Sequence, residues 1–232
     1  MALAQAYLRT GDYEAVDTIV AHALTTARSV GDRRGEAAAV ALQGMTLHFR
    51  AIELPPDERS AIDPSDEQAL FERALATRRE LEDAEGIAES LFQLGLVHQV
   101  LRRDLEAGAP CFREALELVE ELPDADAWLR SEIHRHVGFD LLVREERYDP
   151  AIEHLEKSLE LRRGLAERGW LASAFVALSL AHRLAGEADA AIDFARRSLE
   201  VATDEELRAR VVTAAEDSLA AAEELAELQR GA

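Results

Sequence analysis

The 232-residue sequence has no asparagine, one lysine and one cysteine, and the shortage of cysteine is the most restrictive. With Cys111 alone, the chain can form neither an internal disulfide nor a zinc site built from several thiolates, which fits a reducing cytosol. The missing asparagine and the single Lys157 are typical of codon bias in a GC-rich genome. The frequency of arginine therefore carries little functional information.

Long apolar runs and an excess of basic residues are also missing. No stretch reaches the roughly 18 apolar residues that a membrane span needs, and the N-terminus MALAQAYLRTGDYE lacks a basic segment followed by an apolar one. Lys and Arg number 26 against 46 Asp and Glu, and the formal net charge of −20 would repel a phosphate backbone. We expect a cytoplasmic protein that binds neither nucleic acid nor membrane.

Helix breakers are scarce, with 12 glycines and six prolines, and Ala, Leu, Glu and Arg dominate, which predicts an all-α chain. The sequence also repeats itself: residues 78–98 align without a gap on residues 162–182. The identical pairs are Arg78/Arg162, Arg79/Arg163, Leu81/Leu165, Ala88/Ala172, Leu94/Leu178, Leu96/Leu180 and His98/His182. Such an offset predicts a repeated structural unit.

Small residues recur in each copy of a helix-turn-helix pattern. They predict where the two helices of a hairpin approach closely. In the first helices they are Gly44, Gly95, Gly138 and Ser179. In the second helices they are Ala23, Ala74, Ala115, Ser158 and Ser198, and there a leucine follows each small residue.

The first copy carries Tyr7, the run Gly11-Asp12-Tyr13 and the pair Ala23-Leu24, and in this it resembles the tetratricopeptide repeat family. The connecting segments are similar to the longer variant of about 40 residues per repeat, found in kinesin light chain and bacterial signal-transduction regulators. The resemblance implies a single domain over residues 1–232, a right-handed α-solenoid. His98 and His182 replace the usual aromatic of the first helix, and the proline that normally closes each repeat is missing.

The pattern divides the chain into five hairpins and a final helix. We expect hairpins at 1–29, 34–82, 85–121, 125–167 and 169–202, and an amphipathic capping helix at 204–230. The second hairpin is interrupted by an inserted loop, Leu54–Ser65, followed by the capping-box pattern SDEQ. Pro110 is expected in a first turn, and Asp149 and Pro150 as the cap and first residue of another helix.

Chemical motifs are few. Glu132, His136 and Asp140 stand four residues apart on one predicted helix, a spacing that suits either a divalent metal or side-chain pairs, and side-chain pairs are the expectation. His98 and His182 are expected to be packed and hydrogen-bonded, and Cys111 to be a buried structural thiol. No metal, no cofactor and no enzymatic activity are predicted.

The resemblance implies that the first helices line the inside of the solenoid, which identifies twelve candidate contact residues. They are Met45, His48, Phe49, Phe92, Leu96, Gln99, Arg135, Phe139, Leu142, Val176, Leu180 and Arg183. This wall is largely apolar and lacks the lysines and asparagines with which the cochaperone version grips a terminal carboxylate. Alternatively, a small rotation of the helices would make several of these side chains ordinary core.

Two functions follow from this surface. The first is a non-catalytic interaction scaffold that binds a peptide or an amphipathic helix of a partner protein in an apolar groove. The second is a sensor, regulatory or biosynthetic protein that binds an apolar small molecule in the same groove. In either case Arg135 and Arg183 are the candidates for orienting a carboxylate or phosphate. The oligomeric state is not specified by the sequence.

Overall fold

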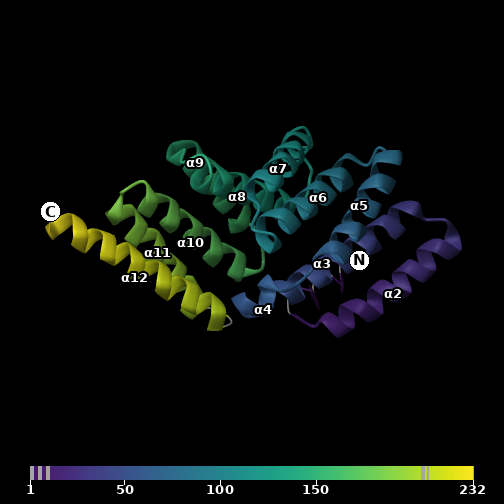
Figure 1. Cartoon of the computed structure of the whole chain (residues 1–232), viewed down its shortest axis with the longest axis horizontal. Coiled ribbons are helices and arrows are strands. Elements are labelled where there is room, and N and C mark those ends of the chain that lie inside the picture. Colours follow the sequence, from purple (N-terminus) through teal and green to yellow (C-terminus); the bar gives the residue numbers. More distant parts are fainter. Residues whose placement is uncertain (1–2, 5–6, 9–10, 205–206, 208, 232) are drawn as a thin grey trace. The chain divides into compact units, whose positions relative to one another are not determined.

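The computed structural model describes residues 3–4, 7–8, 11–204, 207 and 209–231, and within them every regular element is helical. The predicted all-α fold is therefore confirmed. The first of two compact units, residues 1–123, contains α2 (Tyr13–Val30), α3 (Arg33–Glu53), α4 (Pro56–Ser60), α5 (Ser65–Glu80), α6 (Ala84–Leu96), the π-helical turn η1 (Val97–Leu101) and α7 (Leu105–Glu120) (Figure 1).

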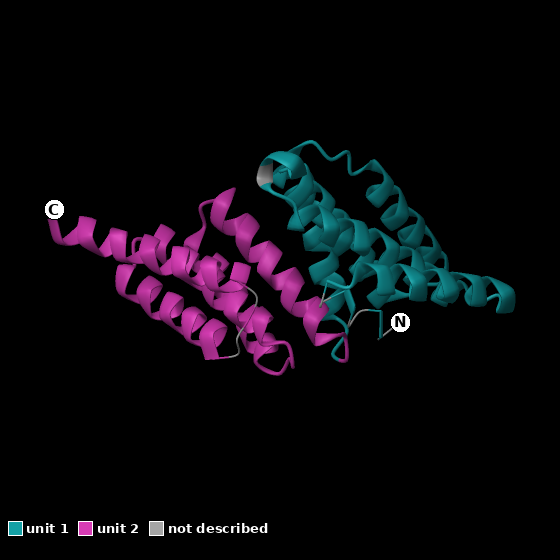
Figure 2. Ribbon diagram, turned by 90° about the horizontal axis from the view of Figure 1, so that it is seen from below, with its two compact units in different colours: residues 1–123 teal, residues 124–232 magenta. Residues whose placement is uncertain are grey.

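The second unit, residues 124–232, contains α8 (Ala127–Val143), α9 (Tyr148–Arg163), α10 (Arg168–Leu184), α11 (Ala188–Asp204) and α12 (Ala209–Gly231) (Figure 2). The boundary between the units falls between the third and fourth predicted hairpins. The single domain over residues 1–232 stays a prediction. No described helix combines the length and the apolar character needed to cross a membrane.

Consecutive helices pack in pairs, as the repeat pattern predicts. The pairs are α3 with α5, α6 with α7, α8 with α9 and α10 with α11. Further contacts join α2 to α3, α5 to α6 and α9 to α10, so successive hairpins stack within each unit. The predicted first helix, residues 1–9, falls on a segment of which only residues 3–4 and 7–8 are described, and those four are helical.

The small residues lie at the closest approaches inside the hairpins. A Cβ atom added at Gly95 would lie 2.5 Å from the ring of Phe112, and one added at Gly44 would overlap the ring of Phe71. Two of the serines also donate to the facing backbone: Ser179 Oγ to the carbonyl of Ala191 at 2.8 Å, and Ser198 Oγ to that of Ala172 at 2.9 Å. Side chains any larger would push the two helices apart.

The capping helix α12 packs against both α11 and α10 and confirms the expected cover for the last hairpin. On its inner side Ala215 and Ala222 are fully buried. Its outer side carries exposed carboxylates, among them Glu216 and Glu224. A polar outer face of this kind is what the end of a repeat stack requires for solubility.

Five of the described helices have an aspartate as their N-cap residue. Each accepts a hydrogen bond from a backbone N–H three residues on, at 2.9–3.4 Å, which satisfies one of the free donors of the first turn. They are Asp12, Asp32, Asp83, Asp104 and Asp126. In four of these turns the preceding residue has a positive φ, and at Glu82 and Arg103 that residue is not glycine.

Two predicted helix starts were wrong in position. Because Asp104 caps α7, the helix starts earlier than expected and Pro110 lies inside it. Helix α9 starts at Tyr148, which makes Pro150 its third residue, where a missing N–H breaks no helical hydrogen bond.

The predicted capping box of SDEQ does not form. Ser65 Oγ donates to the carboxylate of Asp63 at 2.5 Å, and Gln68 Nε2 donates to Glu72 at 2.6 Å instead of reaching back to the start of the helix. The inserted loop before it contains the short helix α4.

Candidate docking surface

The twelve predicted contact residues divide evenly into buried and half-exposed side chains. Six are at most 7% exposed: Met45, His48, Phe92, Leu96, Gln99 and Leu142. His48 Nδ1 lies 2.9 Å from the carboxylate of Glu67, and the ring of Phe92 packs 6.0 Å from that of Phe112. These six side chains are buried in the folded chain, which agrees with the alternative that several of the twelve are ordinary core.

The other six are half-exposed, and only Phe49 among them belongs to the first unit: Phe49, Arg135, Phe139, Val176, Leu180 and Arg183. Helices α8 and α10, which carry the remaining five, contact each other within the second unit. Beside these side chains Val143 is 42% exposed and Leu184 39% exposed. We call this surface the α8–α10 face, and it comprises Arg135, Phe139, Val143, Val176, Leu180, Arg183 and Leu184. Its role in binding stays a prediction.

The acidic ladder on α8 is occupied by arginine partners. Glu132 forms an ion pair with Arg162, and Asp140 accepts two hydrogen bonds from Arg144 at 2.6 and 2.7 Å. The ring nitrogen of His136 lies 3.8 Å from the Glu132 carboxylate. Among the described residues no group of three acidic, histidine or cysteine side chains is arranged to hold a metal. The ladder therefore consists of side-chain pairs.

Arg162 is fully buried and links three helices. Its guanidinium donates to Ser131 Oγ on α8 at 3.3 Å, to the Trp170 carbonyl at 2.9 Å and Ser173 Oγ at 2.7 Å on α10, and to Glu132. Burial lowers the pKa of Arg162 to about 10, and the Glu132 carboxylate opposes that shift. Such a network fixes the position of α8 and α10 relative to α9.

Arg78 repeats this arrangement 84 residues earlier in the chain. It is 4% exposed, donates to Ser90 Oγ at 2.6 Å and pairs with Glu89, so it joins α5 to α6. Sequence reasoning missed the structural role of both arginines. The signal was present, since Arg78 and Arg162 are aligned in the internal repeat, and an arginine retained at an otherwise apolar position indicates a buried network.

His134, buried on α8, and His154, half-buried on α9, form a further polar pair that was not predicted. Their Nδ1 atoms lie 3.0 Å apart, so one ring donates a hydrogen bond and the other accepts it. Burial, followed by the neighbouring ring and the cations of Lys157 and Arg130, lowers the pKa of His134 to about 4. His134 is therefore neutral at physiological pH.

The remaining sequence candidates are His182, His98 and Cys111. His182 stacks on Phe194 at 5.1 Å and bonds to Glu187 at 2.6 Å, which confirms it as a packed, hydrogen-bonded residue. His98 is half-buried, and desolvation lowers its pKa. Cys111 is half-buried rather than buried, and desolvation raises the pKa of its thiol, which disfavours the reactive thiolate.

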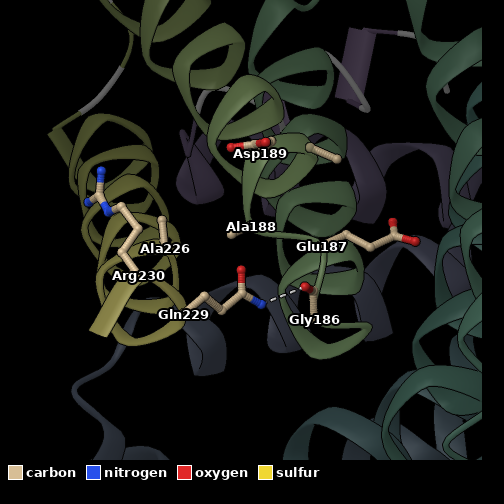
Figure 3. A pocket seen from close by; sticks show the side chains of 8 residues that line it. Gly186, Glu187, Ala188, Asp189, Ala226, Gln229 and Arg230 are labelled. Atoms are coloured by element: carbon tan, nitrogen blue, oxygen red, sulfur yellow. Dashed lines mark hydrogen bonds between the residues drawn. The ribbon is translucent and has the colours of Figure 1, made fainter. Parts of the chain in front are cut away.

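A pocket of about 590 Å³ lies between the turn from α10 to α11 and the last turns of α12 (Figure 3). The side chain of Gln229 reaches across the pocket, and its Nε2 donates a hydrogen bond to the carbonyl of Gly186 at 2.8 Å. Its lining mixes small and charged side chains: Gly186, Glu187, Ala188, Asp189, Ala190, Ala226, Gln229 and Arg230. None of the twelve predicted residues is among them.

Residues 129–204 match the family model of the tetratricopeptide repeat. This segment is therefore similar to tetratricopeptide repeats. A solved structure, BtubC (BKLC) from P. vanneervenii, has a similar fold, with a TM-score of 0.62 over 88% of this chain and 78% of that chain. The two sequences are 18% identical, so the likeness shows the fold alone. The search of curated proteins gave no significant match.

The matched segment runs from α8 into the end of α11. It therefore includes both helices that carry the α8–α10 face. Tetratricopeptide repeats form scaffolds that typically mediate protein interactions, and the family is generally non-catalytic. The identity of what is bound has to be argued from the surface itself.

Proposed function

We propose that this protein is a non-catalytic interaction scaffold that binds a peptide or an amphipathic helix of a partner protein on the α8–α10 face. The observation that carries the proposal is the set of half-exposed apolar side chains at equivalent positions of two contacting first helices, α8 and α10. Phe139, Val176 and Leu180 are half-exposed, and Val143 and Leu184 are more exposed still.

Burial of apolar surface is expected to drive this binding. Covering apolar surface stabilises a complex by roughly 25 cal/mol per Å², and an aromatic side chain at the centre of a patch is a common anchor of binding. Phe139 is the aromatic residue of this face. In the first unit, by contrast, the matching side chains Phe92 and Met45 are only 1% and 5% exposed.

The proposal is tested by partner capture with paired variants. Phe139→Asp and Val176→Asp place a carboxylate on the face, and Val30→Asp places one on an apolar residue of α2 that is 71% exposed. We expect a protein retained from the native host by the wild-type chain to be lost with the first two variants and kept with the third. Circular dichroism and thermal melting confirm that each variant is folded. Retention by all three would contradict the proposal.

An apolar small molecule is the alternative occupant of the same face. The two occupants differ in mass, so native mass spectrometry of the protein purified from its host separates them. A stoichiometric small molecule that disappears in Phe139→Asp supports the alternative. Its absence, together with a captured protein, supports the scaffold.

A further inference from the structure

We infer that the partner segment bound by the α8–α10 face is an acidic amphipathic helix. This inference rests on the proposed function and adds to it the charge and the conformation of the partner. It places the binding site in the second unit, where the two half-exposed arginines of the face would pair with acidic side chains of the partner.

The first observation is the absence of carboxylates from α10. Asp and Glu make up 46 of the 232 residues, yet none occurs in the 17 residues of this helix, which carries Arg168, His182 and Arg183. On α8 the two carboxylates, Glu132 and Asp140, are 6% and 5% exposed and already paired with arginines. No carboxylate is therefore left on these two helices to repel an acidic ligand.

The second observation is that the arginines of the face have no acidic partner. Among the described residues the half-exposed guanidinium of Arg183 forms neither a hydrogen bond nor an ion pair. Arg135 lies 3.1 Å from the ring nitrogen of His136 and pairs with no carboxylate in that part of the chain. Two cations next to an apolar strip are complementary to a ligand that carries carboxylates beside an apolar stripe.

The third observation is the charge of the other helices of the same unit. Counting Lys and Arg against Asp and Glu, α9 has three and four, α11 two and four, and α12 two and five, which gives −1, −2 and −3. The same count gives two and two for α8 and two and none for α10, or 0 and +2. In a protein of net charge −20 the first helices are thus the surface of the second unit that best accepts an acidic partner.

A helical partner fits the shape of the strip. Val176, Leu180 and Leu184 follow each other at four-residue steps along one side of α10, a helix of 17 residues and about 25 Å. A second helix repeats its side chains at the same three- and four-residue steps and can match this strip along its length, whereas an extended peptide places successive side chains on opposite sides. A second helix laid along α10 buries its own stripe and places acidic side chains at Arg135 and Arg183.

The test uses two designed peptides of about 18 residues, or five helical turns. Both have the same Leu/Ala stripe, and their flanks carry glutamate in one and lysine in the other. Affinities are measured by fluorescence anisotropy for the wild type, for Arg183→Glu and for Arg73→Glu. Arg73 is an exposed arginine of α5 with no ion pair among the described residues, so both variants change the net charge equally.

We expect the glutamate peptide to bind and to lose about tenfold in affinity with Arg183→Glu and little with Arg73→Glu. Its affinity should also fall as salt is raised, because exposed charges are then screened. Equal affinities for the two peptides would overturn this inference and leave apolar docking intact. Equal losses in the two variants would also overturn it. If neither peptide binds the wild type, the proposed function fails as well.

Discussion

The imidazoles of His134 and His154 share a hydrogen bond of 3.0 Å between their Nδ1 atoms inside the fourth hairpin. The corresponding positions of the fifth hairpin, four residues before Ser179 and Ser198, hold Phe175 and Phe194, whose rings lie 6.3 Å apart. One ring pair is thus polar and titratable and the other is apolar, at the same place in two adjacent repeats.

This pair predicts a loss of stability in mild acid. The pKa of His134 is lowered in the folded chain to about 4 from the ordinary histidine value of 6.5, so the unfolded chain takes up the proton first. The contribution of neutral His134 to the free energy of unfolding is at most about 3 kcal/mol. It is complete above pH 6.5 and is lost as the pH falls towards 4. Thermal melts across this range measure it.

The control for this prediction comes from the neighbouring repeat. In the double variant His134→Phe/His154→Phe both titratable rings are gone, so the difference between wild type and variant isolates the pair from the carboxylates of the chain. The melting temperature of the variant should fall less between pH 7 and pH 5. Parallel curves for the two proteins would show that the pair does not govern this transition.

Removing the buried arginine is expected to leave an unpaired charge. Arg162→Met strands the Glu132 carboxylate, which is 6% exposed, and should lower the free energy of unfolding by about 3–5 kcal/mol. Arg78→Met should have a smaller effect, because the side chain of its partner Glu89 is 29% exposed and can reach water. Urea denaturation measures both. Adding Glu132→Gln to Arg162→Met should restore part of the loss, and no restoration would assign the effect to packing.

The close approach at Gly95 predicts that a single methyl group destabilises the third hairpin. Gly95→Ala would place its Cβ 2.5 Å from the buried ring of Phe112, which cannot move away, and we expect a loss of about 1–3 kcal/mol. Gly169→Ala is the matched control, since nothing lies within 4 Å of the added atom. That variant should be as stable as the wild type or slightly more so, by up to about 1 kcal/mol. Similar melting temperatures for the two variants would contradict the predicted close packing.

The inserted loop of the first unit should be dispensable for binding. It contains α4 and lies before α5, whereas the α8–α10 face belongs to the second unit. Deleting Pro55–Asp63 should therefore leave the affinity for a captured partner within about twofold of the wild type. Isothermal titration with the purified partner measures this. A large loss would make the loop a contact element and would extend the binding surface to the first unit.

Much of the fold could be predicted because its determinants are local. Periodic apolar residues, aspartate caps and the small residues at Gly44, Gly95, Gly138 and Ser179 all act within one hairpin, and the structure confirms the hairpins they indicate. The errors fell where two local signals compete. At Ser65, for example, the carboxylate of Asp63 takes the hydroxyl that a capping box would have used.

The exposed surface was harder to predict because a small rotation of a helix about its axis exchanges buried and exposed side chains. Leu96 and Phe139 each follow the small glycine of their first helix, the same repeat position, yet Leu96 is 5% exposed and Phe139 is half-exposed. Polar pairs such as His134 with His154 join side chains from two helices. A periodic pattern on one helix does not show them.

Amide hydrogen exchange of the partner-bound protein tests the docking surface most directly. The free and bound chains are compared by mass spectrometry, with a captured partner or the glutamate peptide as ligand. We predict slower exchange in residues 127–143 and 168–184, the two helices of the α8–α10 face, and unchanged exchange in residues 188–204. Protection confined to α9 and α11, or to the first unit, would contradict the account.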